Sequence, residues 1–230
     1  MNAVIISGGH IVDGFALEWL QKNKYDLLIA ADSGMEFLFR HQIMPDIIAG
    51  DFDSVGNEAY EYFAKDCDLK DAPCKEAERN DKTPEILRLN PIKDDTDTEF
   101  VIREAIRRGA TSITVLGGTG TRLDHVLGNV HLLGIGLKCD VKIELVDAHN
   151  RIRMVSKELV LGKETQFGDF VSILPFAGDA KGVTLKGFKY PLEKAVVQSF
   201  SSLGISNEIV EEEAVVQVEE GVLLVIESRD

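Results

Sequence analysis

Two carboxylates, Asp51 and Asp53, stand directly behind a short apolar run and form the most chemically informative spacing in this sequence. The run, Ile47-Ile48-Ala49, is typical of a buried parallel strand, and open α/β sheets bind ligands at the carboxyl ends of such strands. Residues two apart in extended chain point to the same side, so we expect both carboxylates to face one ligand. Carboxylate oxygens suit Mg²⁺ and the phosphates that it carries. A loop whose Asp side chains cap the next helix remains the structural alternative.

Short segments at two other expected strand ends carry small or acidic residues. Ser7-Gly8-Gly9-His10 follows the first strand, where glycines let a ligand approach the backbone closely, although a tight turn explains them equally well. Asp32, Ser33 and Gly34 follow the second strand. The Asp32 carboxylate suits a ribose hydroxyl or a phosphate-bound metal, and capping of the next helix is the alternative.

A denser acidic segment, residues 93–98, follows the fourth expected strand and opens a helix. Asp94, Thr96 and Asp97 are its candidate ligands. Carboxylates at a helix N-terminus also satisfy the helix dipole, so a purely structural role fits as well. If the topology places this segment beside Asp51, the carboxylates converge, and their mutual repulsion indicates a cation.

The most specific segment is glycine-rich and runs from residue 117 to residue 125, with one further polar residue in the helix that follows. Its candidate ligands are Gly117, Gly118, Arg122, Asp124, His125 and Asn129. Glycines bring backbone N–H groups close to phosphate oxygens, and Arg122 supplies a forked cation at a helix start. Asp124 either orients Arg122 or accepts a proton from the nucleophile. For His125, a partly buried structural histidine is the commoner case.

Strand-like and helical stretches alternate before residue 148, which predicts a Rossmann-like parallel sheet with flanking helices. The expected strands are Ala3–Ile6, Leu27–Ala31, Ile47–Ala49, Ile86–Leu89, Ile113–Leu116 and Val141–Val146. Beyond residue 150, short apolar stretches are separated by turn signals and no long helical pattern survives, which predicts a β-sandwich. We therefore expect an α/β domain over residues 1–148 and an all-β domain over residues 149–230.

Within the second half, the expected strands include Phe170–Leu174 and Val183–Leu185 as separate elements. The last two, Ala214–Val218 and Val222–Ile226, flank Glu219-Glu220-Gly221 and predict a hairpin with glycine at a left-handed position.

Composition excludes several classes of partner. The 230 residues carry a net charge of -14, which would repel nucleic acid and acidic membrane surfaces, so we expect neither as a partner. The N-terminal apolar stretch is too short for a signal peptide or a membrane span, and we expect a cytoplasmic protein. Three cysteines without Cys-x-x-Cys spacing indicate neither a disulfide framework nor a zinc site.

Taken in order, these segments resemble the motifs of the thiamine pyrophosphokinase family. The family carries an acidic Gly-Asp-x-Asp-Ser loop, a Lys/Gln-Asp-x-Thr-Asp segment, a Gly-rich Arg-x-Asp-His/Gln segment and a late Ser-Asn pair. Here they are residues 50–54, 93–97 and 117–125, followed by Ser206-Asn207. The usual Ala-Asp-Gly-Gly of the family reads Ala-Asp-Ser-Gly here, and the Cβ of Ser33 would resist a positive φ if the loop demanded one.

The resemblance implies ATP-dependent transfer of a pyrophosphoryl group to thiamine, giving thiamine diphosphate and AMP. It implies that Mg²⁺ is held by Asp51, Asp53 and Asp97, with Asp94 nearby. Arg122 and Asp124 would engage the phosphates or the attacking hydroxyl. Ser206 and Asn207 would face thiamine in a domain that also mediates dimerisation, and a homodimer with active sites between its subunits is implied.

Two other classes of protein remain in competition. Asp51-Phe52-Asp53-Ser54 superficially resembles the loop of haloacid dehalogenase phosphatases, in which the first Asp is a nucleophile. The third possibility is a nucleotide-binding or thiamine-binding protein without catalysis on the same fold.

Overall fold

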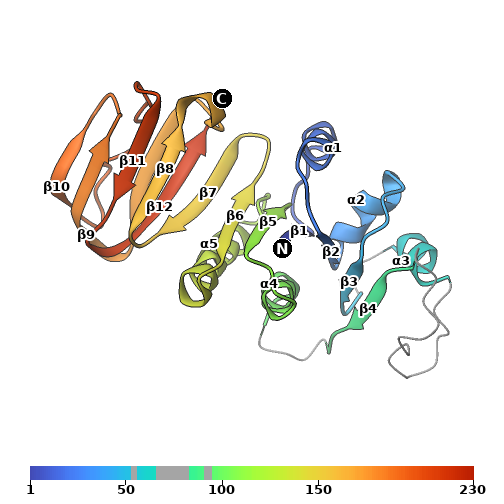
Figure 1. Cartoon of the computed structure of the whole chain (residues 1–230). Coiled ribbons are helices and arrows are strands. Elements are labelled where there is room, and N and C mark those ends of the chain that lie inside the picture. Colours follow the sequence, from blue (N-terminus) through green and yellow to red (C-terminus); the bar gives the residue numbers. More distant parts are fainter. Residues whose placement is uncertain (53–55, 66–82, 91–94) are drawn as a thin grey trace. The chain divides into compact units, whose positions relative to one another are not determined.

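The computed structural model describes residues 1–52, 56–65, 83–90 and 95–230. The chain folds into two compact units, Met1–Leu132 and Leu133–Asp230 (Figure 1). Asp53 and Asp94, both predicted ligands, lie outside the described residues.

The first unit is built on a parallel sheet with the strand order β4-β3-β2-β1-β5. Its strands are β1 (Asn2–Ile6), β2 (Leu27–Ala31), β3 (Ile47–Gly50), β4 (Glu85–Arg88) and β5 (Ser112–Leu116). β2 and β3 are buried at every position, as expected when helices cover both faces of a parallel sheet. The predicted strands of this half all form.

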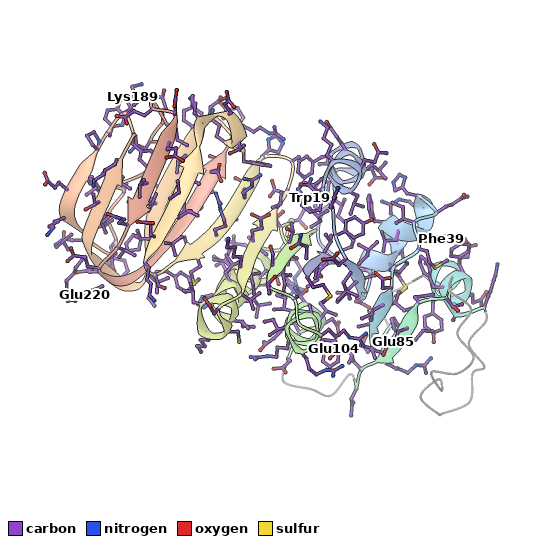
Figure 2. The ribbon with its side chains drawn as sticks, viewed as in Figure 1. Trp19, Phe39, Glu85, Glu104, Lys189 and Glu220 are labelled. Atoms are coloured by element: carbon purple, nitrogen blue, oxygen red, sulfur yellow. The ribbon has the colours of Figure 1, made fainter. Side chains whose placement is uncertain are left out.

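Helices connect these strands. They are α1 (Asp13–Lys22), α2 (Gly34–Arg40), α3 (Asn57–Ala64) and α4 (Asp97–Arg107), and α5 (Leu123–Cys139) runs from the first unit into the second. α4 packs over β1, β2 and β3 through a fully buried face of Val101, Ile102 and Ala105. After its last turn, Arg108 bonds Glu104 at 2.7 Å and Glu85 of β4 at 3.0 Å, which fastens that end of the helix to the sheet. Figure 2 labels the two acceptors, Glu85 and Glu104.

The second unit is antiparallel. Its strands are β6 (Lys142–Val146), β7 (Asn150–Val155), β8 (Glu158–Gly162), β9 (Phe170–Lys186), β10 (Leu192–Val197), β11 (Glu213–Gln217) and β12 (Glu220–Ser228), with a short 3₁₀ turn, η2 (Lys163–Thr165), after β8. One sheet has the strand order β6-β7-β12-β9. β9 also pairs with β10 and with β11, and β11 in turn pairs with β8. Apolar side chains between the layers form a separate core that includes Val171, Ile173, Val183 and Val225. An α/β unit followed by an all-β sandwich is the fold class that the sequence predicts.

β9 belongs to both layers of the sandwich. Its first part pairs with β12 and its last part with β10 and β11. The change falls at Ala177 and Gly178, whose φ angles of 62° and 131° break the regular strand geometry. The two strands predicted over residues 170–174 and 183–185 are therefore parts of one bent strand, because a turn signal inside a strand can mark a bulge instead of an end.

The predicted C-terminal hairpin is wrong. β9 lies between β11 and β12 in the strand order, and both pair with it. Gly221 does adopt a positive φ of 95°. The chain turns there from β11 to β12, but these two strands lie on opposite sides of β9 and make no hydrogen-bonded ladder with each other.

Among the described residues, no helix combines the length and apolarity needed to cross a membrane.

Candidate active site

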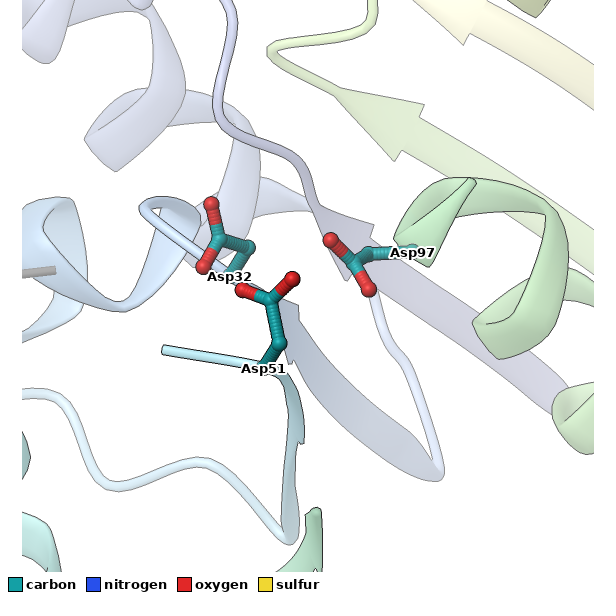
Figure 3. A group of neighbouring side chains, drawn as sticks. All are labelled: Asp32, Asp51 and Asp97. Carbon is teal, nitrogen blue, oxygen red and sulfur yellow. The ribbon is translucent and has the colours of Figure 1, made fainter. Parts of the chain in front are cut away.

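An acidic cluster lies at the carboxyl end of the parallel sheet. Asp32 follows β2, Asp51 follows β3 and Asp97 opens α4, and one carboxylate oxygen from each lies within 4.8 Å of the others (Figure 3). All three residues are half-buried. β2 and β3 are parallel neighbours, so their carboxyl ends, and the carboxylates that follow them, come together.

Asp32 is the member of this cluster that the sequence did not assign to the metal set. It was predicted only as a ligand for a ribose or a phosphate-bound metal. Its position depends on which strand neighbours β3, and the linear sequence does not state the strand order. The usable signal was the shared placement of Asp32 and Asp51 directly behind apolar runs.

Close packing of the backbone sets the position of Asp32. Its N–H donates to the Ala49 carbonyl at 2.8 Å, and its φ is 45°. Asp tolerates this left-handed region better than most residues, and such conformations gather at functional sites. Ser33 has a φ of -62° and precedes α2, so the positive φ falls on Asp32 and the Cβ of Ser33 meets no such obstacle.

Gly34 is required for packing of α2 on the sheet. A Cβ at Gly34 would lie 2.1 Å from the Ile6 carbonyl oxygen. Gly34 was predicted as a ligand residue, and the structure gives it another role, because its missing Cβ lets α2 approach β1.

The segment around Asp51 departs from the expected geometry. Phe52 has a φ of 62°, so the chain between Asp51 and Asp53 is not extended, and the inference that both carboxylates face one side does not follow. The Phe52 ring packs on Tyr60 of α3, with centroids 4.9 Å apart.

At the start of α4, capping and ligation are divided between neighbours. The Thr96 side chain accepts a hydrogen bond from the Glu99 N–H at 3.2 Å and thereby caps the helix. Asp97 is the first helical residue, and its carboxylate belongs to the acidic cluster. Capping therefore accounts for Thr96 and leaves the position of Asp97 to be explained.

A cleft of about 450 Å³ within the first unit adjoins this cluster. Predicted ligand residues that line it are Asp32, Ser33, Thr96, Asp97, Gly117, Gly118, Arg122, His125 and Asn129. The loop from Ser7 to His10 lines it too. The cleft therefore gathers strand-end segments that lie far apart in sequence, from the loop after β1 to the loop after β5, as ligand sites in open α/β sheets do.

Two of these loops are bonded to each other along their backbones. The N–H of Gly9 donates to the Gly117 carbonyl and that of His10 to the Thr119 carbonyl, both at 2.8 Å. A Cβ on Gly9 would lie 2.2 Å from the Thr119 carbonyl oxygen, and Gly117 has a φ of 71°. These glycines therefore serve the approach of one loop to the other. Asn129 supports the same region, since its Nδ2 donates to the Gly118 carbonyl at 2.7 Å.

Arg122 and Asp124 form an exposed ion pair at the start of α5. Arg122 donates to both Asp124 oxygens, at 2.7 and 3.2 Å, and the Asp124 Oδ1 also accepts from the His125 N–H at 3.0 Å. The hydrogen bond from Arg122 lowers the pKa of Asp124 from 3.8 to about 2 and raises that of Arg122. Asp124 is therefore a carboxylate at neutral pH, and its contact with Arg122 is the one that the first of the two expected roles, orientation of Arg122, requires.

The late Ser-Asn pair lies in the second unit. Ser206 is exposed, has a φ of 56° and donates its N–H to the Ser172 Oγ at 3.0 Å. Asn207 is only 4% exposed, and its side chain joins three backbone groups. These are the Tyr190 carbonyl at 2.8 Å, the Tyr190 N–H at 3.0 Å and the Glu208 N–H at 2.9 Å.

Comparison with known proteins agrees with this arrangement. Residues 19–145 match the family model "Thiamin pyrophosphokinase, catalytic domain", and residues 157–223 match "Thiamin pyrophosphokinase, vitamin B1 binding domain". The chain belongs to the thiamin pyrophosphokinase family. The catalytic-domain match contains the acidic cluster and Arg122, and the vitamin B1 binding match contains Ser206 and Asn207.

Individual members of the family resemble the chain over its full length. It is 31% identical to thiamine pyrophosphokinase of Bacillus subtilis over 209 residues, which cover 90% of each chain. The crystal structure of the Bacillus subtilis protein covers 100% of both chains with a TM-score of 0.83 at 30% identity. Thiamin pyrophosphokinase from Candida albicans shares the fold, with a TM-score of 0.76 at 16% identity over 99% of this chain and 88% of the other.

Proposed function

We propose that this protein is a thiamine pyrophosphokinase that transfers the pyrophosphoryl group of ATP to the hydroxyl of thiamine, releasing thiamine diphosphate and AMP. The observation that carries the proposal is the acidic cluster of Asp32, Asp51 and Asp97 beside a glycine-lined cleft, within the segment that matches the family's catalytic domain.

The acidic cluster fits Mg²⁺. Half-buried carboxylate oxygens within 4.8 Å of one another repel each other, and hard oxygen donors are the ligands that Mg²⁺ takes in proteins. Asp32, Asp51 and Asp97 would hold the ion, with Asp53 and Asp94 as further candidates. When bound, Mg²⁺ would neutralise triphosphate charge and polarise the phosphoryl oxygens.

Arg122 would bind phosphate oxygens of ATP through its forked guanidinium. Asp124 holds that guanidinium by two hydrogen bonds. A carboxylate with a pKa of about 2 is a weak base for an alcohol at neutral pH, which favours orientation of Arg122 over proton removal as the role of Asp124. In the transfer, the thiamine hydroxyl loses its proton to water as its oxygen bonds to the β-phosphorus. The bond from that phosphorus to the oxygen bridging the α-phosphorus breaks, and AMP leaves with that oxygen.

The other predicted ligand residues fall into two groups, one that lines the cleft of the first unit and one in the second unit. Ser33, Gly117, Gly118 and His125 line the cleft and would contact the nucleotide. In the second unit, Ser206 is the stronger candidate for contact with thiamine, because the side chain of Asn207 is already engaged by Tyr190 and Glu208. We further propose that the protein works in the cytoplasm as a homodimer with its active sites between subunits, as the family resemblance implies.

One assay separates this proposal from its rivals. Purified protein with ATP, Mg²⁺ and thiamine should form AMP and thiamine diphosphate in equal amounts, and omission of thiamine should stop AMP formation. A phosphatase with Asp51 as nucleophile would release phosphate without thiamine. A binding protein would retain ATP or thiamine without product, and either result would overturn the proposal.

A further inference from the structure

A buried pair of hydroxyl groups links the sheet to the helix that carries Asp97. The Ser7 Oγ and the Thr98 Oγ1 lie 2.8 Å apart, and the two residues are 5% and 8% exposed. Ser7 follows β1, and Thr98 is the residue after Asp97 in α4. The bond thus joins positions 91 residues apart in sequence, immediately beside the acidic cluster.

The position of Asp97 has a different basis from that of the other two carboxylates. Asp32 and Asp51 follow neighbouring strands whose ladder fixes their separation. Asp97 begins a helix that packs on the sheet through the buried side chains of Val101 and Ile102, which make no hydrogen-bonded ladder with the strands. Because hydrogen bonds are directional, a polar contact from the first turn to the sheet fixes the position of that turn more narrowly than apolar packing does.

Each end of α4 has such a contact. At its C-terminal end, Arg108 bonds Glu85 of β4. At its N-terminal end, Thr98 bonds Ser7, whose own backbone is held by a 2.8 Å bond from its N–H to the Leu116 carbonyl. Ser7 is therefore a fixed point directly after β1, and Thr98 transmits its position to the adjacent Asp97.

We infer that Ser7 and Thr98 are positioning residues that hold the Asp97 carboxylate at the distance from Asp32 and Asp51 that a divalent cation requires. Groups that orient a metal ligand commonly matter for affinity almost as much as the ligand itself. The inference rests on the metal role that the proposed function gives to the acidic cluster.

The test is a titration of the full chain with Mn²⁺ alone, in which free Mn²⁺ is measured by electron paramagnetic resonance. Thr98→Val keeps the shape of the side chain and removes its hydroxyl, and Ser7→Ala removes the partner. Each should raise the Mn²⁺ dissociation constant by about tenfold, whereas Thr98→Ser, which retains the hydroxyl, should stay near wild type. The double variant should be no worse than either single variant, because both remove the same bond.

Thr114→Val is the matched control. Thr114 is a buried hydroxyl residue on β5, 7% exposed, and the cleft lining does not include it. Loss of the Thr114 hydroxyl should lower the melting temperature of the protein without changing its affinity for Mn²⁺. If Thr98→Val fails to fold, Ser7→Ala and Thr98→Ser give the same comparison.

The outcomes are distinguishable. Wild-type protein that binds no Mn²⁺ would overturn the metal role of the cluster and this inference with it. Wild-type protein that binds Mn²⁺ with the same affinity as folded Thr98→Val and Ser7→Ala would overturn this inference alone. In turnover assays, Thr98→Val and Ser7→Ala should lose activity at low Mg²⁺ and regain it at high Mg²⁺. A loss of activity that persists at saturating Mg²⁺ would also contradict the inference.

Discussion

Gly50 lies directly against Asp32, and a Cβ on Gly50 would be 3.1 Å from the Asp32 Cα and 3.3 Å from its Cβ. Those separations are tighter than ordinary van der Waals contact, so a methyl group there pushes the ends of β2 and β3 apart. Because Asp51 follows Gly50 directly, the spacing between the two carboxylates depends on this contact.

We therefore expect Gly50→Ala to weaken Mn²⁺ binding and turnover while leaving the protein folded. The destabilisation should be about 1–3 kcal/mol, the usual effect of overpacking, measured by urea denaturation. Gly14→Ala on α1 is the control, because a Cβ there meets nothing within 4 Å. Unchanged Mn²⁺ affinity in folded Gly50→Ala would show that the backbone contact does not set the cluster.

Asp97→Asn separates ligation from helix stabilisation. The free energy of unfolding should fall by no more than about 1 kcal/mol, because that is the usual stabilisation from a negative charge in the first turn of a helix. Turnover should fall roughly 100-fold or more, the range for loss of one preorganised electrostatic group. Asp95→Asn, at an exposed neighbour outside the acidic cluster, should leave turnover near wild type. Parallel losses of turnover and stability in Asp97→Asn would instead favour a structural role for this carboxylate.

The sequence predicted the parallel half of the fold well, because strands buried on both faces are continuous apolar runs that local composition reveals. It could not place Asp32 in the acidic cluster, since that requires knowing that β2 neighbours β3. It also could not anticipate the left-handed turn at Phe52, where a bulky residue is uncommon.

In the antiparallel half, local signals and pairing partners diverged. Gly221 correctly indicated a left-handed turn, but the expected hairpin does not form, because β11 and β12 pair with opposite edges of β9. Turn chemistry specifies the direction of the chain over a few residues, whereas pairing is decided by long-range packing of the sandwich core. For the same reason, Ala177 and Gly178 bend a single strand where two were expected.

The low pKa of Asp124 gives a pH prediction. Its ion pair with Arg122 is complete above pH 3.8 and is lost only as the pH falls through about 2, because the folded-state pKa lies below the ordinary value. Any acid limb in the pH profile of kcat/KM should therefore arise from other groups. Normalised profiles of wild type and Asp124→Asn should have the same shape. An acid limb that disappears in Asp124→Asn would instead identify Asp124 as a base that titrates near neutrality.

Ser206 and Asn207 should differ sharply despite being adjacent. Asn207→Ala leaves backbone groups of Tyr190 and Glu208 without their present partner, so it should destabilise the second unit by about 1–3 kcal/mol, as measured by urea denaturation. Ser206→Ala, at an exposed side chain, should keep stability and raise KM for thiamine. Full stability in Asn207→Ala, or an unchanged KM in Ser206→Ala, would reverse this assignment.

The most direct test of pyrophosphoryl transfer is a single-turnover reaction with ATP labelled in its β-phosphate, with Mg²⁺ and excess thiamine. The label should appear in thiamine diphosphate in step with AMP, with no thiamine monophosphate or ADP at any time. Label that stays in ADP while thiamine monophosphate forms, or phosphate released without transfer to thiamine, would contradict the account.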